Sequence, residues 1–204
     1  MSFLAVPVSG QQLTIGAIGG ARWTGDVYRG FGNAESQAYL FGPSVQVGLP
    51  AGFGVQLDAL YTRSGYSYFI PLIGNQATVR DHASVWEFPL MLQYRLPIPV
   101  VRPFLALGPT FRRVDGRTDE TGYRMATINT STTYASTRKW SAGEAVWSVG
   151  AGLDLGSKHI RITPQFRVAL WRTPSRAGED DVAYHFPWRQ REVQALLGIG
   201  WRWK

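Results

Sequence analysis

The chain has 204 residues, which is enough for one domain, and a formal net charge of +7. It contains no cysteine, which excludes a disulfide framework, a thiolate zinc site and a cysteine nucleophile. No apolar run approaches the roughly 18–20 residues of a membrane helix, so a helical membrane protein is excluded, whereas a membrane barrel, built from short alternating segments, is not.

The first ten residues read M-S-F-L-A-V-P-V-S-G, a short apolar stretch followed by small residues. This order is typical of the end of a secretory signal peptide, although a basic segment before it is missing. We interpret residues 1–10 as a residual signal-peptide-like tail, with a disordered N-terminal tail as the alternative. We expect residues 11–204 to form a single transmembrane β-barrel domain, because no linker interrupts them.

From residue 13 onward, segments alternate between apolar residues and small or polar residues, which is the periodicity of a β-strand with two different faces. In the last segment, E-V-Q-A-L-L-G-I-G-W-R-W-K, one face is apolar and ends in two tryptophans, while the other carries charges, an amide and glycines. Pro43 lacks the N–H of a paired residue, so we expect a bulge there. The predicted strands are 13–23, 38–49, 53–64, 85–96, 101–112, 144–155, 159–171 and 192–203.

The connections between these eight segments alternate between long and short. Within the longest, 113–143, two stretches are expected to extend the flanking strands, with a tip near Asn129. The pattern predicts an all-β fold, an eight-stranded antiparallel up-and-down transmembrane β-barrel with short periplasmic turns and long outer loops. Both termini then lie on the periplasmic side.

Aromatic residues cluster near the ends of the predicted strands, the depth at which amphipathic rings favour the membrane interface. Three belong to the periplasmic ends of their strands and four to the outer ends. The predicted aromatic girdle consists of Tyr39, Tyr61, Trp86 and Trp147 on the outer side, and Tyr94, Trp201 and Trp203 on the inner side.

An eight-stranded barrel is just wide enough for side chains to fill its interior. Inward charges must therefore be paired, because a buried unpaired charge is very costly. We expect Asp154, Arg161 and Arg202 to meet near the periplasmic end, and Arg112 and Arg167 to reach Glu87 in the outer half. The predicted lumen charge network is Asp58, Glu87, Arg112, Asp154, Arg161, Arg167 and Arg202, which favours a salt-bridged plug over an open pore.

Four segments together carry a resemblance: W-E-F-P-L-M-L-Q-Y-R, R-P-F-L-A-L-G-P, V-G-A-G-L-D-L and the closing L-L-G-I-G-W-R-W. Their order and spacing resemble the small bacterial outer-membrane β-barrel proteins of the porin family, over roughly residues 13–203. The resemblance implies a location in the bacterial outer membrane and insertion by the barrel-assembly machinery. It does not establish transport.

The sequence favours a non-enzymatic barrel that has a structural or anchoring role, or acts through its outer loops. One alternative is a narrow small-solute channel, because the inner faces are rich in glycine. A less favoured alternative is a lipid A-modifying enzyme, because His82 and Ser84, with Glu87 nearby, superficially resemble the His-x-Ser of lipid A deacylases. A soluble ligand-binding barrel, with its apolar faces turned inward, is the rival fold.

No residue is assigned as catalytic, cofactor-binding or metal-binding, and no cofactor is expected. His159 and His185 lack partners at ligand spacing, and the acidic segment 178–181 lacks the spaced ligands of a calcium loop. The expected partners are the lipid bilayer and lipopolysaccharide, the barrel-assembly machinery during insertion, and an unknown protein at the outer loops. We expect no nucleic-acid partner, because no basic run or nucleic-acid motif accompanies the charge.

Overall fold

The computed structural model describes residues 12–24, 32–34, 36–72, 75–98, 101–127, 130–156, 159–170 and 192–203. The signal-peptide-like tail at 1–10, the acidic segment 178–181 and His185 lie outside these residues. Within the described ranges, no helix is both long and apolar enough to cross a membrane.

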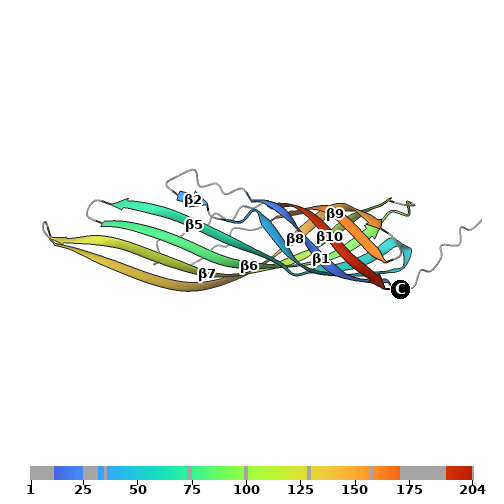
Figure 1. Cartoon of the computed structure of the whole chain (residues 1–204), viewed down its shortest axis with the longest axis horizontal. Helices are drawn as coiled ribbons and strands as arrows, with labels where there is room; N and C mark the ends of the chain where they lie inside the picture. The colour runs from blue at the N-terminus through green and yellow to red at the C-terminus, as the bar shows by residue number, and fades with distance from the viewer. Residues whose placement is uncertain are drawn as a thin grey trace, which may run out of the picture.

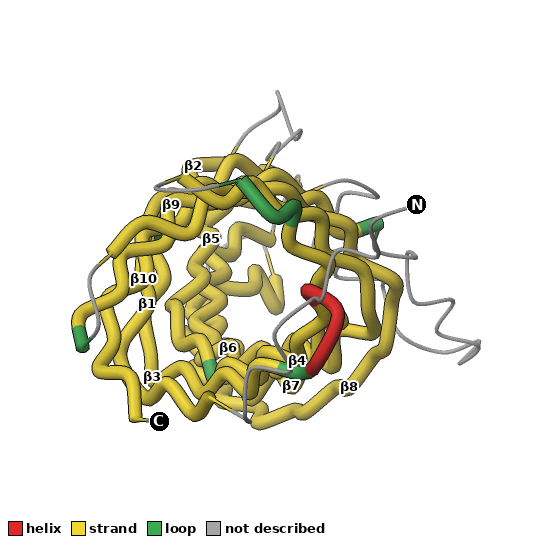
Figure 2. The backbone as a smooth tube through the Cα atoms, turned by 90° about the vertical axis from the view of Figure 1, so that its right-hand side faces the viewer, coloured by secondary structure: helices red, strands yellow, loops and turns green. Residues whose placement is uncertain are grey.

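A single antiparallel sheet closes into a ring, because β1 pairs with both β3 and β10 (Figure 2). β4 and β5 follow each other in one register along β3 and together form one wall strand, so the wall has eight strands. The elements are β1 (Gln12–Thr24), β2 (Gly32–Ala34), β3 (Tyr39–Gly48), the 3₁₀ turn η1 (Pro50–Gly52), β4 (Phe53–Asp58), β5 (Leu60–Leu72), β6 (Asn75–Arg95), β7 (Val101–Thr127), β8 (Thr130–Gly156), β9 (Ile160–Ala169) and β10 (Glu192–Trp203). The predicted fold class is confirmed.

The bulge expected at Pro43 is wrong. The register is unchanged on either side of it, since Ser44 lies opposite Asp58 and Phe41 opposite Tyr61. Pro43 instead causes the break between β4 and β5: its carbonyl accepts a hydrogen bond from the Ala59 N–H at 3.1 Å, but it has no N–H to return. One missing ladder bond interrupts the neighbouring strand without shifting it.

The segment between the third and fourth predicted strands, expected to be a loop, is a β-hairpin, and the extension of the flanking strands expected within 113–143 is observed over the whole segment described. β5 and β6 pair from Leu60–Glu87 to Leu72–Asn75, and β7 and β8 pair as far as Thr127–Thr130. These four strands continue beyond the ring as one curved sheet (Figure 1), and β2 is added along β5. Asn129, the predicted tip, lies outside the described residues, which end at Thr127 on β7 and resume at Thr130 on β8.

The outside of the ring is apolar and the inside is largely polar. Large hydrophobic side chains of the wall point outward, with Leu105 68%, Phe166 63% and Trp147 64% exposed. Adjacent residues on the same strands, such as Arg167 and Ser148, are only 2% exposed. This is the arrangement of an outer-membrane barrel, with lipid outside, and it overturns the soluble barrel with reversed faces.

Apolar clusters share the lumen with the charges, which the prediction of a salt-bridged plug did not include. One cluster joins Ile18, Leu40, Leu60 and Leu196, and another joins Met91, Phe104 and Ala106. A third, formed by Ala83, Val85 and Val114 with Trp140 packed against it, lies at the base of the projecting sheet.

Candidate functional site

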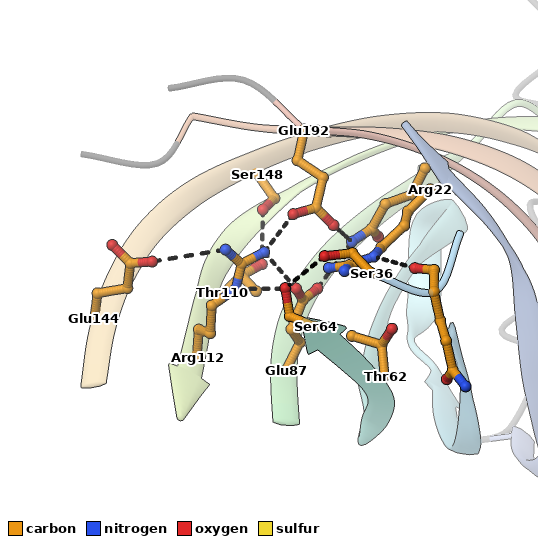
Figure 3. Close-up of polar contacts among 12 residues, drawn as sticks. Arg22, Ser36, Thr62, Ser64, Glu87, Thr110, Arg112, Glu144, Ser148 and Glu192 are labelled. Atoms are coloured by element: carbon orange, nitrogen blue, oxygen red, sulfur yellow. Dashed lines mark hydrogen bonds and ion pairs between the residues drawn. The ribbon is translucent and has the colours of Figure 1, made fainter. Parts of the chain in front are cut away.

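The outer part of the lumen is organised around the guanidinium of Arg112 on β7 (Figure 3). It donates to Glu87 from Nε at 3.0 Å and from Nη2 at 2.5 Å, and Nη2 also donates to Glu192. Glu144 lies 3.7 Å from Nη1. Gln194 bridges the two buried carboxylates, donating to Glu87 at 2.8 Å and to Glu192 at 2.9 Å. Four strands, β6, β7, β8 and β10, thus converge on one cation.

Arg22 on β1 lies on the other side of Glu192 (Figure 3) and donates from Nε to the Gln37 carbonyl at 3.1 Å. Glu87 and Glu192 are each 1% exposed, so water does not solvate their charges. Such a cluster is held together only while every charge keeps its partner, because the low dielectric strengthens both attraction and repulsion.

The middle of the lumen holds a second ion pair, between Asp58 on β4 and Arg167 on β9, at 2.5 Å. Gln56 donates to Asp58 at 2.9 Å. Gln56 in turn accepts from Gln93, which accepts from Gln46, so three amides on the neighbouring strands β4, β6 and β3 form a chain along one side of the lumen. The predicted contact of Arg167 with Glu87 is wrong, because Arg167 pairs with Asp58 one level lower.

At the periplasmic end, Asp154 on β8 is surrounded by three arginines. Arg161 lies 2.7 Å away, and Arg95 and Arg202 each lie 3.5 Å away. Arg95 also donates to Gln93 at 2.9 Å and thereby joins this level to the middle one. Polar contacts therefore continue from the periplasmic mouth to the middle of the barrel.

Several members of this network were missed in the sequence, although the signal for them was present. Each faces the lumen on the same alternate positions that identified Glu87 and Arg167. The two acids were missed because they begin predicted strands, where the position relative to the membrane is least certain. The added residues are Arg22, Gln46, Gln56, Gln93, Arg95, Glu144, Glu192 and Gln194.

The predicted girdle residues lie on the outer surface, and two bands result. Tyr61, half buried, lies between the rings of Phe41 and Trp86, with ring centroids 6.3 Å and 5.1 Å away. Tyr94 packs on Phe53 at 5.1 Å near the periplasmic turn. The other four, Tyr39, Trp147, Trp201 and Trp203, are 47–64% exposed.

The geometry separates the residues of the enzyme alternative. His82 and Ser84 lie on the outward face of β6, whereas Glu87 lies in the lumen, so Glu87 cannot orient His82. The Ser84 hydroxyl lies 3.3 Å from the Tyr61 hydroxyl. Among the described residues, no group of three or more His, Asp or Glu side chains is placed to hold a metal ion.

Beyond the membrane-spanning segments, the projecting sheet buries an acid. Asp81 on β6 is 3% exposed and accepts a hydrogen bond from the Thr118 hydroxyl, which also accepts from Trp140 Nε1 at 3.2 Å. Burial raises the pKa of Asp81, and the Thr118 hydrogen bond only partly offsets this. Folding therefore favours the protonated form of Asp81 relative to the unfolded chain.

We predict that Asp81→Asn stabilises the projecting sheet at neutral pH. A raised carboxyl pKa means that Asp81 favours folding below its unfolded pKa and that this contribution is lost as pH rises through the folded pKa. Asn keeps an acceptor for Thr118 without the buried charge. Amide hydrogen exchange of β6 and β7 should slow in the variant at pH 7, and the difference should shrink toward pH 4. An effect independent of pH would contradict the assignment.

No known family model matches the sequence, and comparison with curated proteins finds no similar sequence. Among solved structures, the N-terminal β-barrel domain of Pseudomonas aeruginosa OprF is 14% identical, with a TM-score of 0.43, over 94% of this chain and 97% of that domain. Yersinia pestis Ail, in complex with the heparin analogue sucrose octasulfate, is 14% identical, with a TM-score of 0.46, over 95% and 97%. The outer membrane protein OprG from Pseudomonas aeruginosa is 11% identical, with a TM-score of 0.44, over 95% of each chain.

Proposed function

We propose that this protein is a non-enzymatic outer-membrane barrel whose filled lumen anchors a projecting β-sheet outside the membrane. The sheet is the interacting part, and lipopolysaccharide and a protein at the cell surface are its proposed partners. Residues 11–204 form one domain in this proposal, delivered by a signal sequence and inserted by the barrel-assembly machinery.

The observation that carries the proposal is the burial of charged side chains at three levels of the barrel. Glu192 is 1% exposed in the outer level, Asp58 1% in the middle, and Asp154 5% at the periplasmic end. A continuous aqueous channel would leave charges along its path solvated. Barrels that conduct freely are usually built from more strands, because eight leave room only for side chains.

The projecting sheet is built to hold its shape. Two glycines of β7 lie directly opposite aromatic residues of β8: Gly116 opposite Trp140, and Gly122 opposite Tyr134. In each pair the aromatic ring covers the glycine, and the Tyr134 hydroxyl also donates to Glu120 at 2.8 Å. Such cross-strand pairs stabilise a hairpin that has no bilayer around it.

We predict that the purified barrel gives no steady ionic conductance in planar lipid bilayers. The measurement is single-channel current at about 1 M salt, with a porin as the positive control and a mock-purified sample as the negative control. Steady, reproducible conductance steps would support the narrow-channel alternative and contradict the filled lumen.

A further inference from the structure

The outward face of the projecting sheet is strongly cationic. Just beyond the outer aromatic band, exposed basic side chains extend across all four strands. We call the following residues the cationic face: Arg63 on β5, Arg80 and His82 on β6, Arg113 and Arg117 on β7, and Lys139 on β8. Arg113 and Arg117 are 70% and 57% exposed, so their charges point into the surroundings rather than into the protein.

Three members of this face lie directly opposite one another across the strands. His82 on β6 is paired with Arg117 on β7, and Arg117 is paired with Lys139 on β8. Whereas Arg80 lies opposite Asp119, the cations of Arg117 and Lys139 lie opposite one another on one face of the sheet, where they repel and destabilise the pairing. An anion bound between them would convert this repulsion into attraction.

The acids on the same face are too few to neutralise it. Asp115 lies 3.0 Å from Arg113, and Asp119 lies 2.6 Å from Arg117, each pair along its own strand. The pKa of Asp119 is lowered by a hydrogen bond from Thr137 and by Arg117, so it remains charged. Arg63, Arg80 and Lys139 have no ion-pair partner in the described part of the chain.

The face is continuous with the surface that contacts hydrocarbon. His82 precedes Trp86 by four residues, about 13 Å along the strand, which places it at or above the headgroups when Trp86 lies at the interface. The opposite side of the barrel differs: within their described ranges, the outward residues of β1, β3, β9 and β10 include no Lys or Arg. Among the described residues, the outward cations near the outer surface therefore gather on one side of the barrel.

We propose that the cationic face binds the phosphate groups of lipid A in the outer leaflet. The proposal rests on the outer-membrane location and orientation proposed above. Arg117 donates to Asp119 from Nε and Nη2 and offers its remaining N–H groups to phosphate oxygens, and Lys139 supplies a mobile point charge. The aromatic row of Phe41, Tyr61 and Trp86 lies below the site, against the lipid's acyl chains.

The test compares two forms of lipid A that share acyl chains and differ in phosphate, with phosphatidylglycerol as an anionic lipid of different chemistry. The folded full chain in neutral detergent is titrated with bisphosphorylated lipid A, dephosphorylated lipid A or phosphatidylglycerol, and bound lipid is counted by native mass spectrometry. We expect bisphosphorylated lipid A to bind at least about tenfold more tightly than the other two, since each basic residue near anionic lipid contributes roughly fivefold.

The variant R117Q/K139Q removes two cations and should weaken binding of bisphosphorylated lipid A by about 25-fold. The control R102Q/R124Q removes the same charge from exposed positions at the periplasmic rim and near the sheet tip, and should leave binding unchanged. Heat-modifiable gel migration verifies that both variants fold. Equal binding of dephosphorylated lipid A or phosphatidylglycerol, or equal losses in the two variants, would overturn the proposal. Failure of this test would leave the conductance result intact, so the filled barrel is tested separately.

Discussion

Replacing Arg112 with methionine is expected to lower the free energy of unfolding by about 3–5 kcal/mol, the largest effect of any charge substitution in the barrel. Arg112 is the cation shared by Glu87 and Glu192, and its side chain is 3% exposed. Without it, two carboxylates remain buried side by side with one amide between them. Their repulsion is no longer compensated, and water cannot reach them.

The matched control is the next residue. Arg113→Met removes a cation that is 70% exposed and pairs only with Asp115 at 3.0 Å, so it should cost no more than about 1 kcal/mol. Both variants are compared by urea unfolding in detergent micelles, followed by tryptophan fluorescence. A triple variant with Glu87→Gln and Glu192→Gln added to Arg112→Met should recover part of the loss, because the two carboxylates that Arg112 neutralised are then uncharged, although the buried Arg22 loses Glu192 as its charged neighbour. Equal stability of the Arg112 and Arg113 variants would refute the network.

The wall strands could be predicted from the sequence because the bilayer imposes a period of two on them. Because lipid lies outside and a polar lumen inside, apolar residues alternate with polar or small residues in every wall strand. β10 (Glu192–Trp203) begins at the residue where this alternation begins in the sequence. The outer halves of β5 to β8 could not be predicted in this way. Above the membrane the outward positions are polar rather than apolar while alternate positions such as Val79 and Ala83 stay buried, so the apolar-outward pattern ends and a segment such as 65–84 resembles a loop.

The alternation of side chains along each strand identified which charged residues face the lumen, but not which of them form ion pairs. Arg167 lies on the correct face to meet either Asp58 or Glu87, and the choice depends on the stagger between distant strands around the ring. That stagger is set by all the strand registers together, which a single sequence does not display. The sequence therefore indicated the composition of the network, and only the structure shows its three levels.

Two Gly-Pro dipeptides mark breaks in the hydrogen-bond ladder between strands, and the sequence alone did not explain them. Gly42-Pro43 and Gly108-Pro109 each coincide with a break in the neighbouring ladder. Because proline has no N–H, the facing carbonyl has no ladder partner, and in both pairs this carbonyl lies over the preceding glycine, as the Ala195 carbonyl lies over Gly20 where no proline follows. A Cβ added at Gly108 would lie 1.9 Å from the Leu90 carbonyl oxygen, and one at Gly42 1.7 Å from that of Ala59. At these two positions the backbone of the neighbouring strand lies so close that only glycine fits.

Gly108→Ala is therefore expected to destabilise the barrel by about 3 kcal/mol, the upper end of the usual penalty for overpacking, because the clash is with backbone and cannot be relieved by a rotamer change. Gly143→Ala is the control: the nearest atom to its added Cβ, the Arg112 carbonyl oxygen, is 3.7 Å away, and its stability should stay within about 1 kcal/mol of the parent. Urea unfolding and the rate of folding into micelles are the measurements.

Comparing Gly108→Ala with the parent protein also separates the two explanations of the glycine-rich inner faces. If the glycines kept a channel open, Gly108→Ala would narrow it, lowering conductance while leaving stability close to that of the parent. If they allow strands to approach closely around a filled interior, the variant loses stability and conductance is absent in both proteins. The Leu90 carbonyl fills the space that a side chain at residue 108 would need, and the neighbouring Met91 is completely buried. Both observations favour close strand approach, so a stable Gly108→Ala variant with reduced conductance would contradict a filled lumen.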